Sequence, residues 1–445
     1  MGLGSRTPEA SRWPYFVVPP LVVALLGLCY LDCLLAPAGI IGSLLPEGLG
    51  LSLVTRNAEA GTTPAEKSYQ PLPAEIRGEL DIAAAAELDG RLVQHIESGE
   101  DVIYSIDPAL QSRAQELLDD GNLLMGAIVL VDSRTGRILV LSSTGEALTP
   151  SAEEPAGVPA AFSAEAPAAS VFKVVTGAAL LETAGVSPTE EVCYWGGSHK
   201  LVLANLEEDP PKDKTCATLS YALGKSLNPV FAKLADRHLG HDTLEEAARR
   251  FGFGEILPLD YPAEPVVSSL EIPEDRLEFA RTAAGFWHVH LTPLLAAFLA
   301  QSIAQGGAML HPILVDEVRA GDQVVWAGQP RWLRRTVSAE TASNLAAMMM
   351  NTTTTGTAHK YFIDPKGNPY LPGIQVAGKT GTLTRTTPFR AYTWFVGFAP
   401  ADDPEVAVAA LAVNAPGWKV KGTALARDIL RKYFEIKKMA GEAAP

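Results

Sequence analysis

Ser170 and Lys173 are the first residues in the chain whose types and spacing suggest chemistry. They stand at the start of residues 171–181, a segment with a single charge that is typical of a buried helix. Residues three apart share one helical face, so the lysine can reach the serine hydroxyl. A buried, unpaired ammonium tends to lose its proton, and the neutral amine can then activate a serine nucleophile. The alternative is a lysine that extends to the surface beside a capping serine.

Two further motifs offer groups for the other side of such a site. Ser226-Leu227-Asn228 precedes Pro229 and an apolar helical segment, and its alternative explanation is an ordinary helix cap. Lys379-Thr380-Gly381 lies in a β-rich run, where strand glycines mark the close approach of another backbone. Alternation along a strand places the threonines at 380 and 382 on one face. Its alternative explanation is an edge strand that a lysine protects from aggregation.

The segments around these motifs predict a domain that mixes helices and strands. Asp107-Pro108 is typical of a helix start, with aspartate as the N-cap and proline at the first position. A short acidic, alanine-rich segment at residues 75–97 also favours a helix. The other predicted elements are strands at 125–131 and 137–141, a surface loop at 146–169, helical segments to about residue 350, strands at 374–382, 392–398 and 406–413, and a closing helix.

The composition excludes several classes of protein. The 445 residues carry 36 Lys and Arg against 51 Asp and Glu, a net charge of −15 that argues against a nucleic-acid partner. Hydrophobic residues make up 47% and charged residues 20%, which are ordinary values for a folded globular chain. Four cysteines are too few for a disulfide scaffold.

The N-terminal region predicts a membrane anchor. Residues 13–31 carry no charge and are long enough for a helix that crosses a bilayer, which we place at residues 13–35. Arg6 and Arg12 precede the run and the next basic residue is Arg56, so residues 1–12 are expected in the cytoplasm and the rest outside. The alternative is a signal peptide cleaved near Ala36-Pro37-Ala38. Residues 36–101 are expected to form a linker and a small pedestal, 102–439 the catalytic domain, and 440–445 a tail.

The order of the three motifs, S-x-x-K, S-x-N and K-T-G, resembles the penicillin-binding protein transpeptidase family. Other segments resemble the family in the family's order, among them IYSIDPALQSRAQELL, GAIVLVDSRTGRILVLSS and WFVGFAPADDPEVAVAALAVN. The resemblance covers about residues 102 to 439. It implies an α/β (α+β) fold of the β-lactamase and transpeptidase type, with a five-stranded antiparallel sheet flanked by helices and an all-helical lobe.

The resemblance also implies a role for each motif residue in an acyl-transfer reaction. Ser170 would be the acylated nucleophile and Lys173 its base. Ser226 would relay the proton to the leaving amine, Lys379 would supply positive charge near it, and Asn228 would hydrogen-bond the substrate amide.

Substrate binding is implied for the strand that carries the third motif. Thr380 and Thr382 would bind the substrate carboxylate, with Gly381 between them. The backbone N–H groups of Ser170 and Thr382 would form the oxyanion hole. The substrate would be a stem peptide ending in D-Ala-D-Ala, extended along this strand. β-Lactams would acylate the same serine.

The function implied is therefore a peptidoglycan D,D-transpeptidase, single-pass in the bacterial cytoplasmic membrane with its catalytic domain outside. Since the chain has no room for a glycosyltransferase domain, a separate glycosyltransferase is a candidate partner. Alternatives are a D,D-carboxypeptidase, a serine β-lactamase, and a non-catalytic penicillin sensor or division scaffold. A class A β-lactamase needs a glutamate in an E-x-x-x-N segment, and we interpret Glu340 to Asn344, which fits that skeleton, as a helix start.

The remaining cysteines and histidines give weaker signals. Cys193 and Cys216 would be able to form a disulfide outside the cytoplasm, and the sequence leaves open whether they do. Cys29 and Cys33 lie in or beside the anchor, without a lipoprotein cleavage context. His288-x-His290 has ligand-like spacing but no evident third ligand, so we expect a structural role, no metal and no cofactor.

Overall fold

The computed structural model describes residues 70–145, 148, 157–262 and 267–443. The predicted cytoplasmic tail, membrane helix and most of the linker, with Cys29 and Cys33, lie outside the described residues. Within those ranges, no helix combines the length and the apolar composition that a bilayer crossing requires.

A five-stranded antiparallel sheet forms the centre of the catalytic domain, as predicted. Its order is β12 (Ala377–Thr386), β13 (Phe389–Ala399), β14 (Val406–Asn414), β4 (Met125–Asp132) and β5 (Ile138–Thr144). Every residue of β14 is buried, because apolar side chains cover both faces of the sheet. The strand β12, which carries the K-T-G motif, lies at the edge of the sheet.

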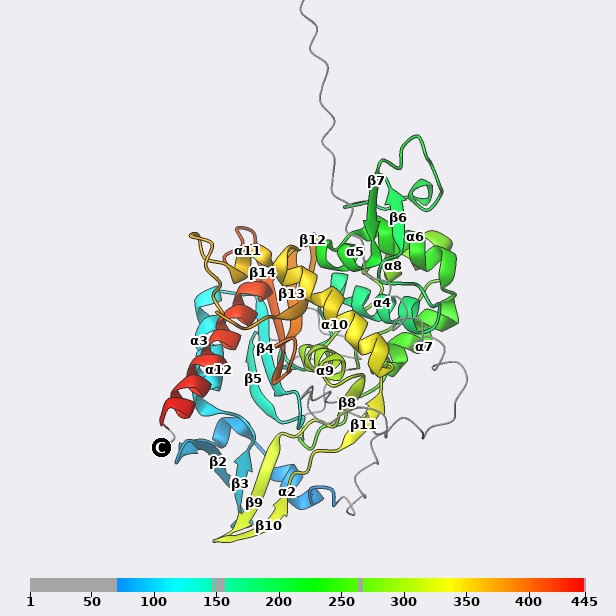
Figure 1. Cartoon of the computed structure of the whole chain (residues 1–445). Helices are drawn as coiled ribbons and strands as arrows, with labels where there is room; N and C mark the ends of the chain where they lie inside the picture. The colour runs from blue at the N-terminus through cyan, green and yellow to red at the C-terminus, as the bar shows by residue number, and fades with distance from the viewer. Residues whose placement is uncertain (1–69, 146–147, 149–156, 263–266, 444–445) are drawn as a thin grey trace, which may run out of the picture. The chain divides into compact units, whose positions relative to one another are not determined.

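Helices cover both faces of this sheet (Figure 1). On one face lie α3 (Pro108–Gly121) and α12 (Gly422–Ala443), and on the other lie α9 (Pro293–Ala304) and α10 (Ala339–Thr354). The predicted start of α3 is confirmed, since Asp107 Oδ1 accepts a hydrogen bond from the Leu110 N–H and Pro108 takes the first position. The helix α9 is buried over nearly its whole length, which agrees with its apolar composition.

Within the described residues, the helical lobe contains five helices and one β-hairpin. The helices were expected, but the hairpin was not predicted. The helices are α4 (Lys173–Glu182), α5 (Leu219–Lys225), α6 (Asn228–His238), α7 (His241–Arg250) and α8 (Arg276–Ala283). The hairpin pairs β6 (Glu191–Tyr194) with β7 (Thr215–Thr218), and the loop between them holds a 3-10 turn, η3 (Leu203–Asn205). A disulfide joins Cys193 to Cys216 across the hairpin.

A second five-stranded sheet joins the N-terminal part of the described chain to its middle. Its order is β1 (Ala86–Leu88), β2 (Arg91–His95), β3 (Asp101–Tyr104), β9 (Val315–Ala320) and β10 (Gln323–Ala327). A short antiparallel pair flanks β9 and β10 in sequence, with β8 (Ala308–Leu310) before them and β11 (Trp332–Arg335) after them. The small helices are α2 (Ala74–Glu79), η1 (Ile82–Ala84) and α11 (His359–Phe362).

The helix predicted at residues 75–97 is wrong beyond its first turns. Only α2 is α-helical, and the chain then forms the antiparallel pair β1 and β2. The reversal falls at Asp89 and Gly90, whose φ angles of 50° and 72° are those of a two-residue hairpin turn. Asp-Gly is a strong turn signal, and here it outweighs the helix propensity of the alanines before it.

A buried ion pair fastens the loop of the β6–β7 hairpin to α6. Lys233 Nζ lies 2.8 Å from Asp213 Oδ2 and 3.0 Å from the carbonyl oxygen of Cys193. The two charged side chains are 0% and 3% exposed. Since neither charge can turn to water, each depends on the other for its stability in the interior.

We expect Asp213→Ala to lower the free energy of unfolding by about 3–5 kcal/mol, because it leaves the Lys233 ammonium buried without its counter-ion. The double variant Asp213→Ala/Lys233→Met should lose less than the single variant, since it removes both charges. Chemical denaturation of both proteins checks this. A double variant that loses as much stability as Asp213→Ala, or more, would contradict a direct pairing of the two residues.

Candidate active site

Ser170 lies on a tight turn immediately before the buried helix. It belongs to a 3-10 turn, η2 (Ala169–Phe172), and α4 begins at Lys173, two residues later than predicted. Ala169 has a φ of 49°, an uncommon angle for a residue other than glycine. Gly285 lies against this turn, and a Cβ there would approach the Ala169 carbonyl oxygen to 2.3 Å. The strained backbone and the glycine behind it hold Ser170 half-exposed at the end of an otherwise buried segment.

Lys173 is wholly buried and bonded to three neutral oxygens. Its Nζ donates to Ser170 Oγ at 2.9 Å, to Asn228 Oδ1 at 2.7 Å, and to the carbonyl oxygen of Ala284. This arrangement places the amine within proton-transfer distance of the serine hydroxyl. The alternative of a lysine that extends to the surface is therefore excluded.

Ser226 and Asn228 come from the turn between α5 and α6. Ser226 has a φ of 58° and caps the end of α5, while Asn228 is the first residue of α6. The left-handed backbone at Ser226 ends one helix and lets the next begin two residues later. The turn thereby gives the site two polar side chains from adjacent helix ends.

Lys379 connects this turn to the edge strand β12. Its Nζ donates to Ser226 Oγ at 2.9 Å and to the carbonyl oxygen of Thr380 at 2.9 Å, and its side chain is wholly buried. The site thus contains two hydrogen-bonded pairs, Ser170 with Lys173 and Ser226 with Lys379.

The two buried lysines of the site differ in what lowers their affinity for protons. Burial lowers the pKa of Lys173 well below its usual value, and the charge of Lys379 lowers it further. Burial lowers the pKa of Lys379 to about 7. Because Lys173 experiences both effects, it gives up its proton more readily than Lys379. The electrostatics therefore favour a neutral base beside Ser170 and a cation beside Ser226.

The edge strand β12 passes directly beside η2, the turn that carries Ser170. A Cβ at Gly381 would lie 3.2 Å from the Ala169 Cβ. Glycine at this position therefore lets β12 pack closely against the η2 turn, a close approach of the kind that a strand glycine indicates. Thr380 is half-buried and its Oγ1 lies 2.5 Å from Thr357 Oγ1, while Thr382 is exposed. Since β12 has a neighbouring strand on one side only, its other edge has backbone groups available to an extended peptide.

Several groups in the site were not predicted from the sequence. These are the carbonyl oxygens of Ala284 and Ser198 and the hydroxyl of Thr357. Carbonyl groups leave no mark in a residue pattern, because every residue has one. Thr357 follows the sequence T-T-T-T-G, where a run of similar threonines gives no reason to prefer one of them.

The other candidate residues lie in structural roles. Glu340 is exposed in the first turn of α10, the helix start that we predicted. His288 Nε2 lies 3.0 Å from Glu278 Oε2, and His290 Nδ1 lies 3.1 Å from Ser269 Oγ. Each histidine of the H-x-H pair thus has a protein partner of its own.

Comparison with known proteins agrees with this geometry. The model of the penicillin binding protein transpeptidase domain matches residues 126–435. Over 369 residues the chain is 32% identical to the peptidoglycan D,D-transpeptidase PbpA of Mycobacterium tuberculosis, which covers 76% of this chain and 72% of the relative.

Solved structures give the same result. The penicillin G acyl-enzyme complex of penicillin-binding protein A from M. tuberculosis superposes with a TM-score of 0.60 at 30% identity, covering 76% of this chain and 80% of that chain. The D,D-transpeptidase domain of a peptidoglycan glycosyltransferase from Eggerthella lenta superposes with a TM-score of 0.63 at 25% identity, covering 81% and 92%. The chain therefore belongs to the penicillin-binding protein transpeptidase family.

Proposed function

We propose that this protein is a peptidoglycan D,D-transpeptidase that works through an acyl-enzyme on Ser170. The observation that carries the proposal is the hydrogen bond from the wholly buried Lys173 to Ser170 Oγ, in a site that lowers the pKa of Lys173. The two N–H groups of the neutral amine donate to Asn228 Oδ1 and the Ala284 carbonyl, which leaves its lone pair to take the Ser170 proton as the nucleophile attacks. The PbpA relative is named for the same activity.

The reaction begins when Ser170 Oγ attacks the carbonyl carbon between the two terminal D-alanines and its proton passes to Lys173. The backbone N–H groups of Ser170 and Thr382 stabilise the oxyanion. The proton taken by Lys173 is relayed through Ser226, which regains its own proton, to the leaving amine; the C–N bond breaks and D-alanine departs. The amine of a second stem peptide then attacks the ester, the bond between the acyl carbon and Ser170 Oγ breaks, and one proton of the amine passes through Lys173 to Ser170 Oγ as the new peptide bond forms.

Substrate binding follows from the edge position of β12. The donor stem peptide lies extended beside residues 379–382, and its terminal carboxylate is bound by Thr380, Thr382 and the positive charge of Lys379. Gly381 lets this strand approach η2, the turn that carries Ser170. β-Lactams carry a carboxylate and a reactive amide in a comparable arrangement, so they acylate the same serine.

The geometry supports a transpeptidase over a β-lactamase. All three groups that accept a hydrogen bond from Lys173 are neutral, and the E-x-x-x-N glutamate, Glu340, is exposed in a helix start. Among the described residues, this hydrogen-bond cluster thus contains no carboxylate that could activate water on the acyl-enzyme. The intact pairs of Ser170 with Lys173 and Ser226 with Lys379 favour an active enzyme over a non-catalytic sensor or scaffold.

We place the catalytic domain outside the cytoplasmic membrane, held by the helix predicted at residues 13–35. The disulfide between Cys193 and Cys216 supports this placement, since disulfides persist in oxidising compartments. A separate glycosyltransferase would supply the glycan strands that this enzyme cross-links.

Labelling with a fluorescent penicillin tests the proposal. Wild-type protein should acquire a covalent label that persists for many minutes, and Ser170→Ala should acquire none. A Ser170-dependent label that is released rapidly would indicate a β-lactamase instead. Incubation with stem peptides should yield dimers, whereas release of D-alanine without dimers would indicate a carboxypeptidase.

A further inference from the structure

The segment closed by the disulfide, residues 193–216, extends from β6 to β7 and contacts the active site. Its two cysteines are directly paired in the β6–β7 ladder, 23 positions apart in sequence. A two-stranded hairpin with few ladder pairs is only marginally stable by itself. The disulfide therefore fixes the base of a long loop that its short strands would hold weakly.

Asn228 receives a hydrogen-bond partner from this loop. Its Nδ2 donates to the carbonyl oxygen of Ser198 at 2.6 Å, while its Oδ1 accepts from Lys173 Nζ at 2.7 Å. The two ends of an amide differ, since one donates and the other accepts. A turned amide would point its NH₂ group at the lysine and its oxygen at a carbonyl oxygen. The Ser198 carbonyl thus selects the amide orientation in which Asn228 Oδ1 accepts a hydrogen bond from Lys173.

The loop is seated closely on the start of α6. Gly197 has a φ of 73°, and a Cβ there would approach Pro229 Cβ to 3.0 Å. Arg281 of α8 donates to the carbonyl oxygen of Leu201 at 2.6 Å, which fixes the loop at a second point. The same helix α8 is followed by Ala284, whose carbonyl accepts from Lys173. The loop and the lysine are thus held by the same neighbouring elements.

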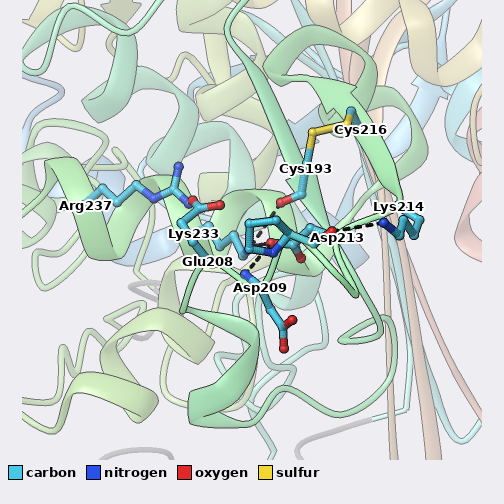
Figure 2. The surroundings of a disulfide bond; sticks show 9 residues. Cys193, Glu208, Asp209, Asp213, Lys214, Cys216, Lys233 and Arg237 are labelled. Carbon is cyan, nitrogen blue, oxygen red and sulfur yellow. Dashed lines mark hydrogen bonds and ion pairs between the residues drawn. A yellow bond between two sulfur atoms is a disulfide. The ribbon is translucent and has the colours of Figure 1, made fainter.

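The far part of the segment is also attached to α6. Lys233 contacts both Asp213 and the Cys193 carbonyl oxygen, beside the disulfide (Figure 2). Lys233 lies on the helix that begins at Asn228. The segment therefore contacts α6 at its first residue and again farther along, and both contacts depend on the loop keeping its shape.

We propose that the disulfide-closed segment is a positioning element for Asn228. The disulfide between Cys193 and Cys216 keeps the Ser198 carbonyl in place, and this carbonyl keeps the Asn228 amide turned toward Lys173. The proposal rests on the proposed function, because it assigns the segment an influence on acylation of Ser170. Ser198 acts through Asn228 and is a positioning residue, without contact to the reacting atoms.

The test compares acylation rates of the full-length protein with its disulfide intact and reduced. Reduction by a phosphine should slow acylation of the wild type by a fluorescent penicillin about tenfold, the effect of losing one hydrogen bond. The variant Cys193→Ala/Cys216→Ala should be equally slow and should not respond to the reductant. In Asn228→Ala, which acylates slowly from the outset, reduction should have no further effect, since the two changes act through one group.

A second pair of variants leaves the disulfide untouched. Gly197→Ala should slow acylation because its Cβ pushes the loop away from Pro229. Gly196→Ala is the matched control, since its φ of 55° imposes similar backbone strain but its Cβ would meet only Asn205 Nδ2 at 3.5 Å. It should acylate at nearly the wild-type rate.

Two outcomes would overturn the positioning role. One is an unchanged acylation rate in wild-type protein whose thiols are shown to be free, with Gly197→Ala equal to Gly196→Ala. The other is an equal slowing by reduction in wild type and in Asn228→Ala, which would show that the segment acts elsewhere. Both leave the Ser170-dependent label of the oxidised protein intact. Absence of that label would instead reject the proposed function.

Discussion

Replacing Lys173 by methionine is expected to slow acylation of Ser170 by about 10³-fold at neutral pH. Methionine fills a similar volume but is unable to accept a proton, so the serine must attack without a base. The chain should remain folded, because the substitution removes a buried polar group rather than a packing side chain. The measurement is the second-order rate constant for acylation by a fluorescent penicillin.

Thr176→Val is the matched control for this experiment. Thr176 is wholly buried on the same helix, and its Oγ1 donates to the Ala283 carbonyl oxygen at 2.8 Å, next to the carbonyl that Lys173 contacts. Losing this bond should cost about 1 kcal/mol of stability and leave acylation near the wild-type rate. Acylation of Lys173→Met near the wild-type rate would show that another group takes the serine proton.

Local sequence signals predicted the elements that carry the site. The aspartate and proline at 107 and 108 marked the start of α3, and the long apolar runs marked β4, β13 and β14. These signals succeed because each element satisfies its own caps or buries its own side chains, whatever surrounds it. The S-x-N motif lies at a helix boundary and K-T-G on a strand, as predicted, whereas Ser170 of S-x-x-K lies on the 3-10 turn before the buried helix.

The sequence failed where distant contacts decide the structure. The strands from β6 to β11 are three to six residues long. They range from the wholly buried β8 to the largely exposed β10 and carry no clear alternation, and we predicted mainly helices there. The turn at Asp89 and Gly90 was overlooked in favour of the alanines before it. The second sheet pairs segments about 200 residues apart in sequence, Asp101–Tyr104 with Val315–Ala320, and local propensity contains no record of such pairing.

The candidate active site likewise contains groups that the sequence predicted and groups that it did not. The side chains of the three motifs, which the fold brings together, stood out because serine, lysine and asparagine at fixed spacing carry a chemical meaning. The groups that orient them did not, because they act through the backbone. The Ala284 carbonyl, the φ angle of Ala169 and the Ser198 carbonyl are set by how the chain folds back on itself.

The pH dependence of acylation should report the two lysines separately. Lys379 has a pKa of about 7, so it is charged below that pH and neutral above it. Its charge attracts the carboxylate of a penicillin, and acylation should therefore slow as the pH rises through about 7. Lys173 must be neutral to act as a base, and burial and the charge of Lys379 hold its pKa well below its usual value. Acylation should therefore also slow at acidic pH, where Lys173 becomes protonated, which gives a bell-shaped profile.

Variants of Lys379 test whether this lysine causes the slowing of acylation above pH 7. Lys379→Arg keeps a charge at every pH of the experiment, so its rate should no longer fall above pH 7. Lys379→Met has no charge at any pH, so its rate should be low throughout and should keep only the acidic limb. The second-order rate constant at low probe concentration is the appropriate measurement, because it reports the free enzyme. A descending limb that persists unchanged in Lys379→Arg would mean that a group other than Lys379 titrates in this range and that the substrate carboxylate is bound without help from the charge of Lys379.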